Sequence, residues 1–169
     1  MLRKKEAKME LRDAEAEDLG AILAIYNEVI LTSTAVYAEE IVDLANRQAW
    51  FEARRRAGYP VLVAAAARCW ASARSATGGP WPCYAATVEH SVHVRADRRG
   101  QGIGRAIVAE LAERARAAGK HVMLGGIDAD NAASIGLHRN LGFEQAARHG
   151  EVGRKFDRWL DLVIMERRP

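Results

Sequence analysis

The chain has 169 residues, a formal net charge of +3 and two cysteines. This length predicts a single domain over residues 1–169, large enough to bury a sizeable core. No apolar run approaches the roughly 20 residues needed to cross a bilayer. No apolar signal-peptide core follows the charged residues 1–6. We therefore expect a cytoplasmic protein with no membrane partner.

Metal and nucleic-acid sites have little support in the sequence. Cys69 and Cys83 match no metal-ligand spacing, and a disulfide framework is not expected. The histidines outside residue 138 show no ligand spacing either, so we expect no metal. The arginine run 54–56 predicts a solvated helix face. No basic stripe carries interleaved aromatics, which argues against a nucleic-acid partner.

The first half of the chain predicts a strand, two helices and a buried strand. Residues 9–12 alternate as a strand, and the acidic residues 13–18 precede a helix whose apolar stripe runs from 19 to 30. Thr-Ser-Thr at 32–34 ends that helix, and residues 35–40 form an extended or loop piece. A second helix is expected from about 43 to 57 before a buried strand at 60–65.

Residues 66–80 have no clear period, although a strand hairpin is expected there. One hypothesis is that this segment is translated out of frame. If the codons are GC-rich, with Arg68 as AGG and Cys69 and Trp70 as TGC and TGG, a reading from the third base of the Ala66 codon permits Gly-Glu-Val-Leu-Gly and then Ser-Phe-Gly-Asp-Trp-Arg-Pro. These codons are assumed, and the alternative is a genuine, unusual local sequence.

Clear periodicity returns in the second half. Strands are expected at 87–94 and 121–127, with a helix to about residue 118 between them. A helix over 131–140, a strand after the turn at 141–143 and a final strand at 156–165 follow. This order of strands and helices predicts an α/β or α+β sheet with helices on its faces.

The stretch 92–108 combines a strand, a basic glycine turn and the start of a helix. Gly100, Gly102 and Gly104 allow positive φ and a close approach of the backbone to a ligand. A turn that opens a helix directs unpaired N–H groups at one point, which the helix dipole makes favourable for anions. Arg98, Arg99 and Arg105 add positive charge. The stretch therefore predicts a phosphate cradle.

Two familiar phosphate loops do not match this turn. The dinucleotide pattern G-x-G-x-x-G fails because residue 105 is Arg and residue 107 is Ile, and no Gly-Lys-Ser/Thr follows as in a P-loop. A glycine-capped strand-to-helix turn without a ligand stays an alternative.

Residues 99–104, Arg-Gly-Gln-Gly-Ile-Gly, fit the Gln/Arg-x-x-Gly-x-Gly/Ala signature of the GNAT acyltransferases, and the chain resembles that superfamily. The resemblance implies a twisted mixed sheet flanked by about four helices. It implies acetyl-CoA as cosubstrate, with the pantetheine arm in a splay beside Val92, His93 and Val94. The pyrophosphate is expected at the turn, on Arg99, Gly100, Gln101, Gly102, Ile103, Gly104 and Arg105.

Four further segments narrow the resemblance. Residues 131–143 look like the C-terminal GNAT helix and its Leu-Gly-Phe ending. Residues 26–28 with 32–35, then 87–94 and 153–159, resemble the phosphinothricin and methionine sulfoximine/sulfone N-acetyltransferase branch. This branch implies transfer of acetyl to the α-amine of a small amino-acid analogue, and a homodimer.

Acetylation of an α-amine, whose pKa is near 8, is helped by a positioned base. Glu89 lies in the strand just before the cradle, and the resemblance makes it the general base, acting through water. The alternative is a strand-edge carboxylate paired with an arginine. Neither cysteine stands in a motif that would activate it, so no covalent enzyme intermediate is expected.

The helix at 131–140 supplies three more expected site residues. Asn131 resembles the superfamily asparagine that bonds the pantetheine, a role compatible with an ordinary helix N-cap. Ser134 is expected in the same cofactor site. His138 stands where many members have a tyrosine as general acid, so it either donates a proton to the thiolate or packs beside CoA.

The acceptor pocket is the weakest part of the pattern. Thr34, Tyr37 and Lys155 are the candidate substrate-binding residues. The branch carries Asp-Trp-Arg-Pro, whose arginine approaches the substrate carboxylate, whereas this chain has Gly-Pro-Trp-Pro at 79–82. Without this arginine we expect weaker binding of amino acids, whereas the shifted reading frame would restore it. The rivals are a GNAT enzyme that acetylates another amine (antibiotic, polyamine or protein terminus), a CoA-binding module without turnover and, more distantly, a nucleotide-binding module.

Overall fold

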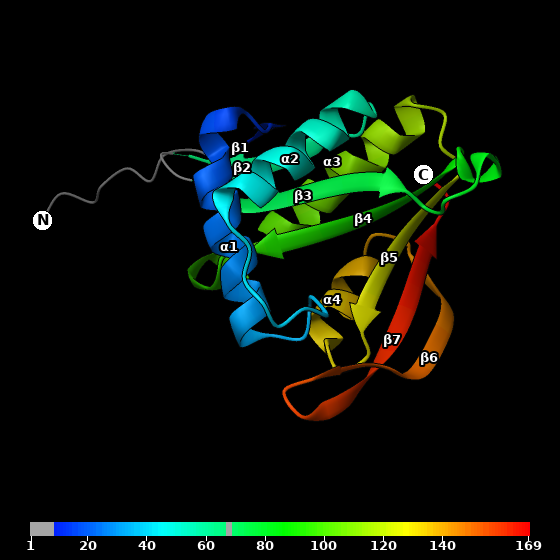
Figure 1. The fold of residues 1–169 in the computed structure, drawn as a ribbon. Helices are drawn as coiled ribbons and strands as arrows, with labels where there is room; N and C mark the ends of the chain where they lie inside the picture. Colours follow the sequence, from blue (N-terminus) through cyan, green and yellow to red (C-terminus); the bar gives the residue numbers. More distant parts are fainter. Residues whose placement is uncertain (1–8, 67–68) are drawn as a thin grey trace, which may run out of the picture.

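The computed structural model describes residues 9–66 and 69–169, so the charged residues 1–6 lie outside the described part. Within that part, seven strands form one sheet in the order β1-β2-β3-β4-β5-β7-β6. Figure 1 shows helices on both faces of this sheet. The strands are β1 (Glu10–Asp13), β2 (Val61–Ala65), β3 (Cys69–Thr77), β4 (Thr87–Val94), β5 (Val122–Asp128), β6 (Glu144–Lys155) and β7 (Arg158–Arg167).

Four α-helices occur in the described residues, as predicted: α1 (Leu19–Thr32), α2 (Leu44–Arg56), α3 (Ile103–Ala117) and α4 (Ala132–Arg139). Their ends follow local chemistry. The Asp43 side chain caps α2 by accepting the N–H of Asn46 at 2.8 Å, and Gly58 follows α2 with φ +72°. None of these helices is long and apolar enough to span a membrane.

The segment with the irregular sequence forms the strand that was expected. β3 pairs antiparallel with β2 and with β4 and so lies inside the sheet. Its small side chains, among them Ala71, Ser72 and Ala73, are buried. Residues 67–68 lie outside the described part. The sequence as printed therefore supplies a central strand, whether or not its reading frame is the original one.

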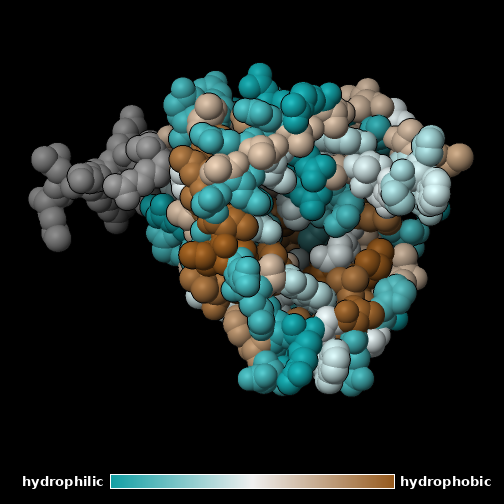
Figure 2. Space-filling view, viewed as in Figure 1, coloured by the Kyte–Doolittle hydropathy of each residue, from teal (hydrophilic) through white to brown (hydrophobic). Residues whose placement is uncertain are grey.

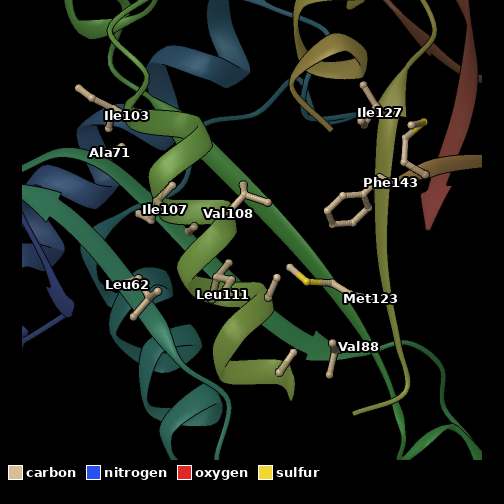
Figure 3. Close-up of a cluster of buried hydrophobic side chains, with 14 of the residues drawn as sticks. Leu62, Ala71, Val88, Ile103, Ile107, Val108, Leu111, Met123, Ile127 and Phe143 are labelled. Atoms are coloured by element: carbon tan, nitrogen blue, oxygen red, sulfur yellow. The ribbon is translucent and has the colours of Figure 1, made fainter. Parts of the chain in front are cut away.

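The core lies on both faces of the sheet. On one face, α3 packs Ile107 and Leu111 against Leu62 and Met123, all at most 1% exposed (Figure 3). On the other face, α1 and α2 bury a second cluster: Leu19, Ile22, Ile25, Phe51, Val61, Val63 and Cys69. Burying each large apolar side chain is worth about 1.5–3 kcal/mol. These two layers fix the orientation of β4, which carries most of the expected site.

Alternate residues of β4 serve the two layers. Val88 packs in the α3 cluster and His90 contacts His138 of α4. On the opposite face, the ring of His93 meets Tyr26 of α1 at 5.6 Å between centroids. The side chains of His90 and His93 therefore face opposite sides, as the period of a strand predicts. Glu89 shares the face of His93, on the side covered by α1 and α2.

Candidate active site

The glycine turn before α3 has the geometry of an anion cradle. Gly100 and Gly102 have φ of +73° and +77°, which L side chains rarely adopt. Among the described residues, no backbone carbonyl accepts the N–H groups of residues 100–105, and the first bond of the helix runs from Ala106 N–H to Gly102 O at 3.0 Å. Free N–H groups and the dipole of α3 thus favour an anion at one place.

Gly104 has a different role from the other two glycines. It is buried, and a Cβ at this position would stand 3.1 Å from Leu137 Cδ1 and 3.5 Å from Val94 Cγ2. The glycine therefore lets α3 start close to β4 and α4. Arg105 and Gln101 are exposed beside it, while the Arg99 Nε donates to Val94 O at 3.0 Å and ties the turn to the end of β4.

The strands β4 and β5 separate next to this cradle. They are the one parallel pair of the described sheet, and their pairing ends at His90 and Gly125. Beyond this point β4 continues to Val94, still paired with β3, and β5 continues to Asp128, still paired with β7. Figure 1 shows the two strands diverging, with α4 near the opening. The facing backbone edge of residues 91–94 is thus open to a ligand strand.

The helix α4 begins at this opening. Asn131 Oδ1 accepts the N–H of Ser134 at 3.0 Å, so Asn131 is the helix N-cap. Its side-chain amide makes no further bond among the described residues, which leaves that group free to face a ligand. The capping role and the expected role at the pantetheine are therefore compatible.

His138 is engaged on both ring nitrogens. Its Nε2 lies 2.9 Å from His90 Nε2, and its Nδ1 lies 2.7 Å from Ser134 O. The ring is 2% exposed and also meets Phe143 edge-on. Burial lowers the pKa of His138 and lowers that of His90 to about 3. In this arrangement neither nitrogen of His138 faces open space.

Glu89 is exposed at the junction of two cavities. One, of about 340 Å³, lies between α1, α2, β3 and β4, and the other, of about 390 Å³, lies toward β5 and β7. Both are lined by Glu89 together with Ala35 and Gly126. No arginine forms a salt bridge with Glu89 among the described residues, so the structure does not show the paired alternative. Figure 2 shows a hollow near the centre of this face.

The larger share of charge in the first cavity is positive. Three arginines line it: Arg47 and Arg54 of α2 and Arg74 of β3. Burial lowers the pKa of Arg74, and the nearby Glu89 opposes that shift. None of the three was among the predicted site residues, and Arg54 belongs to the run 54–56 that the sequence predicts as a solvated face. The helical spacing of Arg47, Trp50 and Arg54 (i, i+3, i+7) is the signal that places them on one side of α2.

The three predicted acceptor-pocket residues have different surroundings. Tyr37 lines the second cavity, where its hydroxyl donates to Asp161 O at 3.0 Å, and burial raises its pKa to about 12. Thr34 is half-buried in the loop after α1 but lines neither cavity. Its neighbours Ala35 and Val36 are the residues of that loop that reach the first cavity.

Lys155 is placed away from the position expected for a substrate-binding residue. Its side chain is 1% exposed, and its Nζ donates to the carbonyls of Ile30, Ser33 and Val36 at 2.6, 2.8 and 2.9 Å. An ammonium has three N–H donors, and all three are used. Lys155 therefore fixes the end of α1 and the loop that follows, and no donor is left for a ligand.

No group of three or more histidine, cysteine or carboxylate side chains that could hold a metal occurs in residues 9–66 and 69–169. Both cysteines are free; Cys69 is buried and Cys83 is exposed. Burial raises the pKa of Cys69 to about 11, so its thiol stays protonated at neutral pH.

Comparison with known proteins identifies the family. The model of the acetyltransferase (GNAT) family matches residues 22–143. The chain belongs to the GNAT acetyltransferase family. It is 53% identical, over 92% of each chain, to an L-methionine sulfoximine/L-methionine sulfone acetyltransferase of Pseudomonas paraeruginosa. It is also 35% identical to the phosphinothricin N-acetyltransferase of Alcaligenes faecalis, over 93% of this chain and 81% of that one.

Solved GNAT structures share the whole architecture. A Salmonella typhimurium acetyltransferase with its cofactor acetyl-CoA superposes with a TM-score of 0.92 at 43% identity, covering 95% of this chain and 93% of that one. The ribosomal-protein-alanine N-acetyltransferase of Brucella melitensis superposes with a TM-score of 0.93 at 44% identity, covering 95% and 99%. The mixed sheet with its splay is thus the GNAT fold, and this chain is an acetyltransferase.

Proposed function

We propose that the chain transfers acetyl from acetyl-CoA to the α-amine of a small amino-acid analogue. Methionine sulfoximine or methionine sulfone is the first candidate acceptor and phosphinothricin the second, because relatives at 53% and 35% identity carry these names. The observation that carries the proposal is the place of Glu89. Its carboxylate stands one residue before the β4–β5 pairing ends and lines both cavities on that face.

The residues around the splay fit acetyl-CoA. The N–H groups of residues 101–105, with Gly100 and Arg99 beside them, would hold the pyrophosphate, since these amides have no backbone partner. The open backbone edge of Val92, His93 and Val94 would pair with the pantetheine arm. Asn131 and Ser134, at the start of α4, would contact the arm from the other side. When bound, acetyl-CoA supplies an activated acetyl thioester. The backbone N–H groups of the open edge would polarise its carbonyl.

Glu89 acts on the acceptor. An α-amine must lose a proton to become a nucleophile, and near neutral pH much of it is protonated. The Glu89 carboxylate takes this proton through an intervening water, as a general base does. No arginine neutralises it by a salt bridge among the described residues, so the carboxylate is available for that role.

His138 is proposed as a member of the site that orients its neighbours. Donation of a proton to the departing thiolate would require its Nε2 to leave His90, because its Nδ1 is bonded to Ser134 O. In the arrangement observed, the ring instead joins α4 to β4 beneath the splay. The protonated, buried Cys69 is no nucleophile, which supports direct transfer to the amine.

A rival acceptor has a specific observation in its favour. The Brucella enzyme, whose name specifies a ribosomal-protein alanine, superposes with a TM-score of 0.93, against 0.92 for a phosphinothricin acetyltransferase of Sinorhizobium meliloti. A panel that includes methionine sulfoximine, methionine sulfone, phosphinothricin, a polyamine and an alanine-starting peptide distinguishes these substrates. Binding of CoA without transfer to any acceptor would support a module that has lost turnover.

The test of the proposal is release of CoA from acetyl-CoA in the presence of methionine sulfoximine. Glu89→Gln should lower kcat about 10²–10⁴-fold and leave CoA affinity unchanged, because it removes the base and not the cradle. Glu144→Gln, at an exposed carboxylate of β6, is the matched control. Full activity of Glu89→Gln would refute the base, and failure to bind CoA would refute the cradle.

We also propose that residues 1–169 act as a single domain, in the cytoplasm, as a homodimer. Support for a dimer comes from the large apolar side chains exposed on β6, on β7 and at the turn between them, Val152, Phe156 and Trp159. Light scattering on wild type and on Trp159→Glu would test it. A monomeric wild type would exclude this interface.

A further inference from the structure

The cavity between α1, α2, β3 and β4 has an excess of positive charge. Its walls carry three guanidinium groups, Arg47, Arg54 and Arg74, against one carboxylate, Glu89. None of these arginines makes a salt bridge in the described part of the chain. Arg47 is buried, and Arg54 and Arg74 are half-buried. Guanidinium groups keep their charge in proteins, so withdrawing these three from water near a single carboxylate has a cost that a further anion would offset. The cavity is therefore built to receive a negative group.

Strand register places Arg74 next to Glu89. In the β3–β4 ladder, Arg74 is opposite Ser91 and Ala76 is opposite Glu89. Residues that face each other across a ladder share one face of the sheet, so Arg74 and Glu89 are diagonal neighbours on the α1–α2 side. Such neighbours lie about 7–8 Å apart, close enough for two side chains to hold the two ends of one small molecule.

The two arginines of α2 close the cavity from the other side. Arg47 is buried, with its guanidinium stacked 4.2 Å from the centroid of Tyr26 and donating to Asn46 Oδ1. The Nε of Arg54 is buried and has no hydrogen-bond partner among the described residues. A buried N–H of this kind normally has an acceptor. An anion in the cavity would supply one.

We propose that Arg74 binds the α-carboxylate of the acceptor amino acid, with Arg47 and Arg54 completing the cationic wall. The inference rests on the proposed function. An α-amino acid places its carboxylate two bonds from its amine, so a carboxylate on Arg74 sets the amine toward Glu89. An arginine fork suits a carboxylate because it can donate two parallel N–H bonds.

This assignment differs from the pattern that the sequence resembles. In that pattern the arginine of Asp-Trp-Arg-Pro approaches the substrate carboxylate, and this chain has Gly-Pro-Trp-Pro at 79–82 instead. Trp81 of that segment is 71% exposed, and no residue of 79–82 lines either cavity. In this chain Arg74, which lies in β3 before residues 79–82, supplies a guanidinium group to the cavity.

The test compares two acceptors that differ by one carboxylate: methionine sulfone and 3-(methylsulfonyl)propan-1-amine. Arg74→Gln should lower kcat/KM for methionine sulfone about 30- to 100-fold, mainly through KM, because a charged hydrogen-bonded pair is lost. The same variant should leave kcat/KM for the amine and the affinity for CoA within about twofold. Arg74→Lys, which keeps the charge without the fork, should recover part of the loss.

Arg56→Gln is the matched control, because it removes the same charge from the exposed last turn of α2. It should leave both acceptors unchanged, and melting temperatures confirm that all variants fold. If Arg74→Gln lowers both acceptors equally or neither, the carboxylate site is wrong although the proposed function stands. If wild type acetylates neither acceptor but does acetylate another amine, the proposed function itself is wrong.

Discussion

The Nε2 atoms of His90 and His138 lie 2.9 Å apart, in a contact that joins β4 to α4. Each ring also directs its Nδ1 at a backbone carbonyl, Leu124 O at 2.8 Å and Ser134 O at 2.7 Å. Two neutral rings bring two N–H groups to these three contacts, so one contact is made without a proton. A third proton would satisfy all three, but burial opposes it and lowers the pKa of both rings.

Acid should therefore destabilise the fold well above the range in which carboxylates titrate. The unfolded His90 has a pKa near 6.5, whereas burial lowers the folded value to about 3. At pH values between these two pKa values, His90 binds a proton in the unfolded chain but not in the folded chain. The stability present above pH 6.5 is lost as the pH falls, by about 1.4 kcal/mol per pH unit for each such histidine. Burial is the main cause that lowers the pKa of His93 to about 4, so His93 also makes the folded chain less stable as the pH falls.

Urea unfolding at about pH 7, 6 and 5 measures this slope. His90→Asn should flatten it, while His121→Gln, at an exposed histidine, should leave it unchanged. Equal unfolding free energies at pH 7 and 5 would contradict the neutral, buried state of these rings.

The cradle can be tested through its glycine conformations. Gly102→Ala should weaken CoA binding by about tenfold or more, because a φ of +77° strains any L side chain by roughly 1–2 kcal/mol and the turn would have to rearrange. Gly119→Ala introduces the same strain, at φ +68°, beyond the other end of α3. Calorimetric titration with CoA should show a loss for Gly102→Ala alone, although both variants melt earlier. Equal CoA affinity in the two would exclude the turn as the phosphate site.

Lys155 should matter for stability more than for chemistry. Lys155→Met leaves the carbonyls of Ile30, Ser33 and Val36 without their donor, and should lower the free energy of unfolding by about 2–5 kcal/mol. Lys120→Met removes a lysine that donates to one carbonyl, Ala85 O, and should cost less than about 1 kcal/mol. Urea unfolding compares them. If Lys155→Met is as stable as wild type but has a raised KM for the acceptor, Lys155 binds substrate and the structural role is wrong.

The reading frame of residues 66–83 is settled by the gene. The hypothesis of a shifted frame requires codons that, read from the third base of the Ala66 codon, encode Ser-Phe-Gly-Asp-Trp-Arg-Pro. Any other codons across this stretch would refute the hypothesis of a shifted frame. The outcome also affects the acceptor site, because the shifted reading removes Arg74 and restores the arginine of the branch. An enzyme with the restored segment should acetylate methionine sulfone although it lacks Arg74 in β3.

Local chemistry was enough to predict most elements. The Asp43 cap, the glycines at 58 and 102 and the alternation in β4 each act within a few residues, so the sequence alone predicts α2, α3 and the strand that leads to the cradle. The place of Glu89 beside the splay also follows from its position in that strand, given the family resemblance.

The surroundings of Lys155 and of the cavity arginines depend on long-range packing, which the sequence analysis did not predict. Lys155 meets carbonyls more than a hundred residues away, and no local pattern predicts that an ammonium will be buried in this way. Arg54 belongs to a run whose other members, Arg55 and Arg56, are exposed as predicted. Arg54 shares one side of α2 with Arg47 and Trp50, and that side faces the cavity.

The open edge of β4 has a consequence for how such a protein changes over time. In the proposed site, the acetyl donor would be held mostly by main-chain N–H groups in β4 and in the turn before α3, and these groups are the same whatever side chains the residues carry. The proposed acceptor cavity is lined by side chains from α1, α2 and β3. With this division, mutations in the cavity can alter which amine is accepted while the binding of the acetyl donor stays the same.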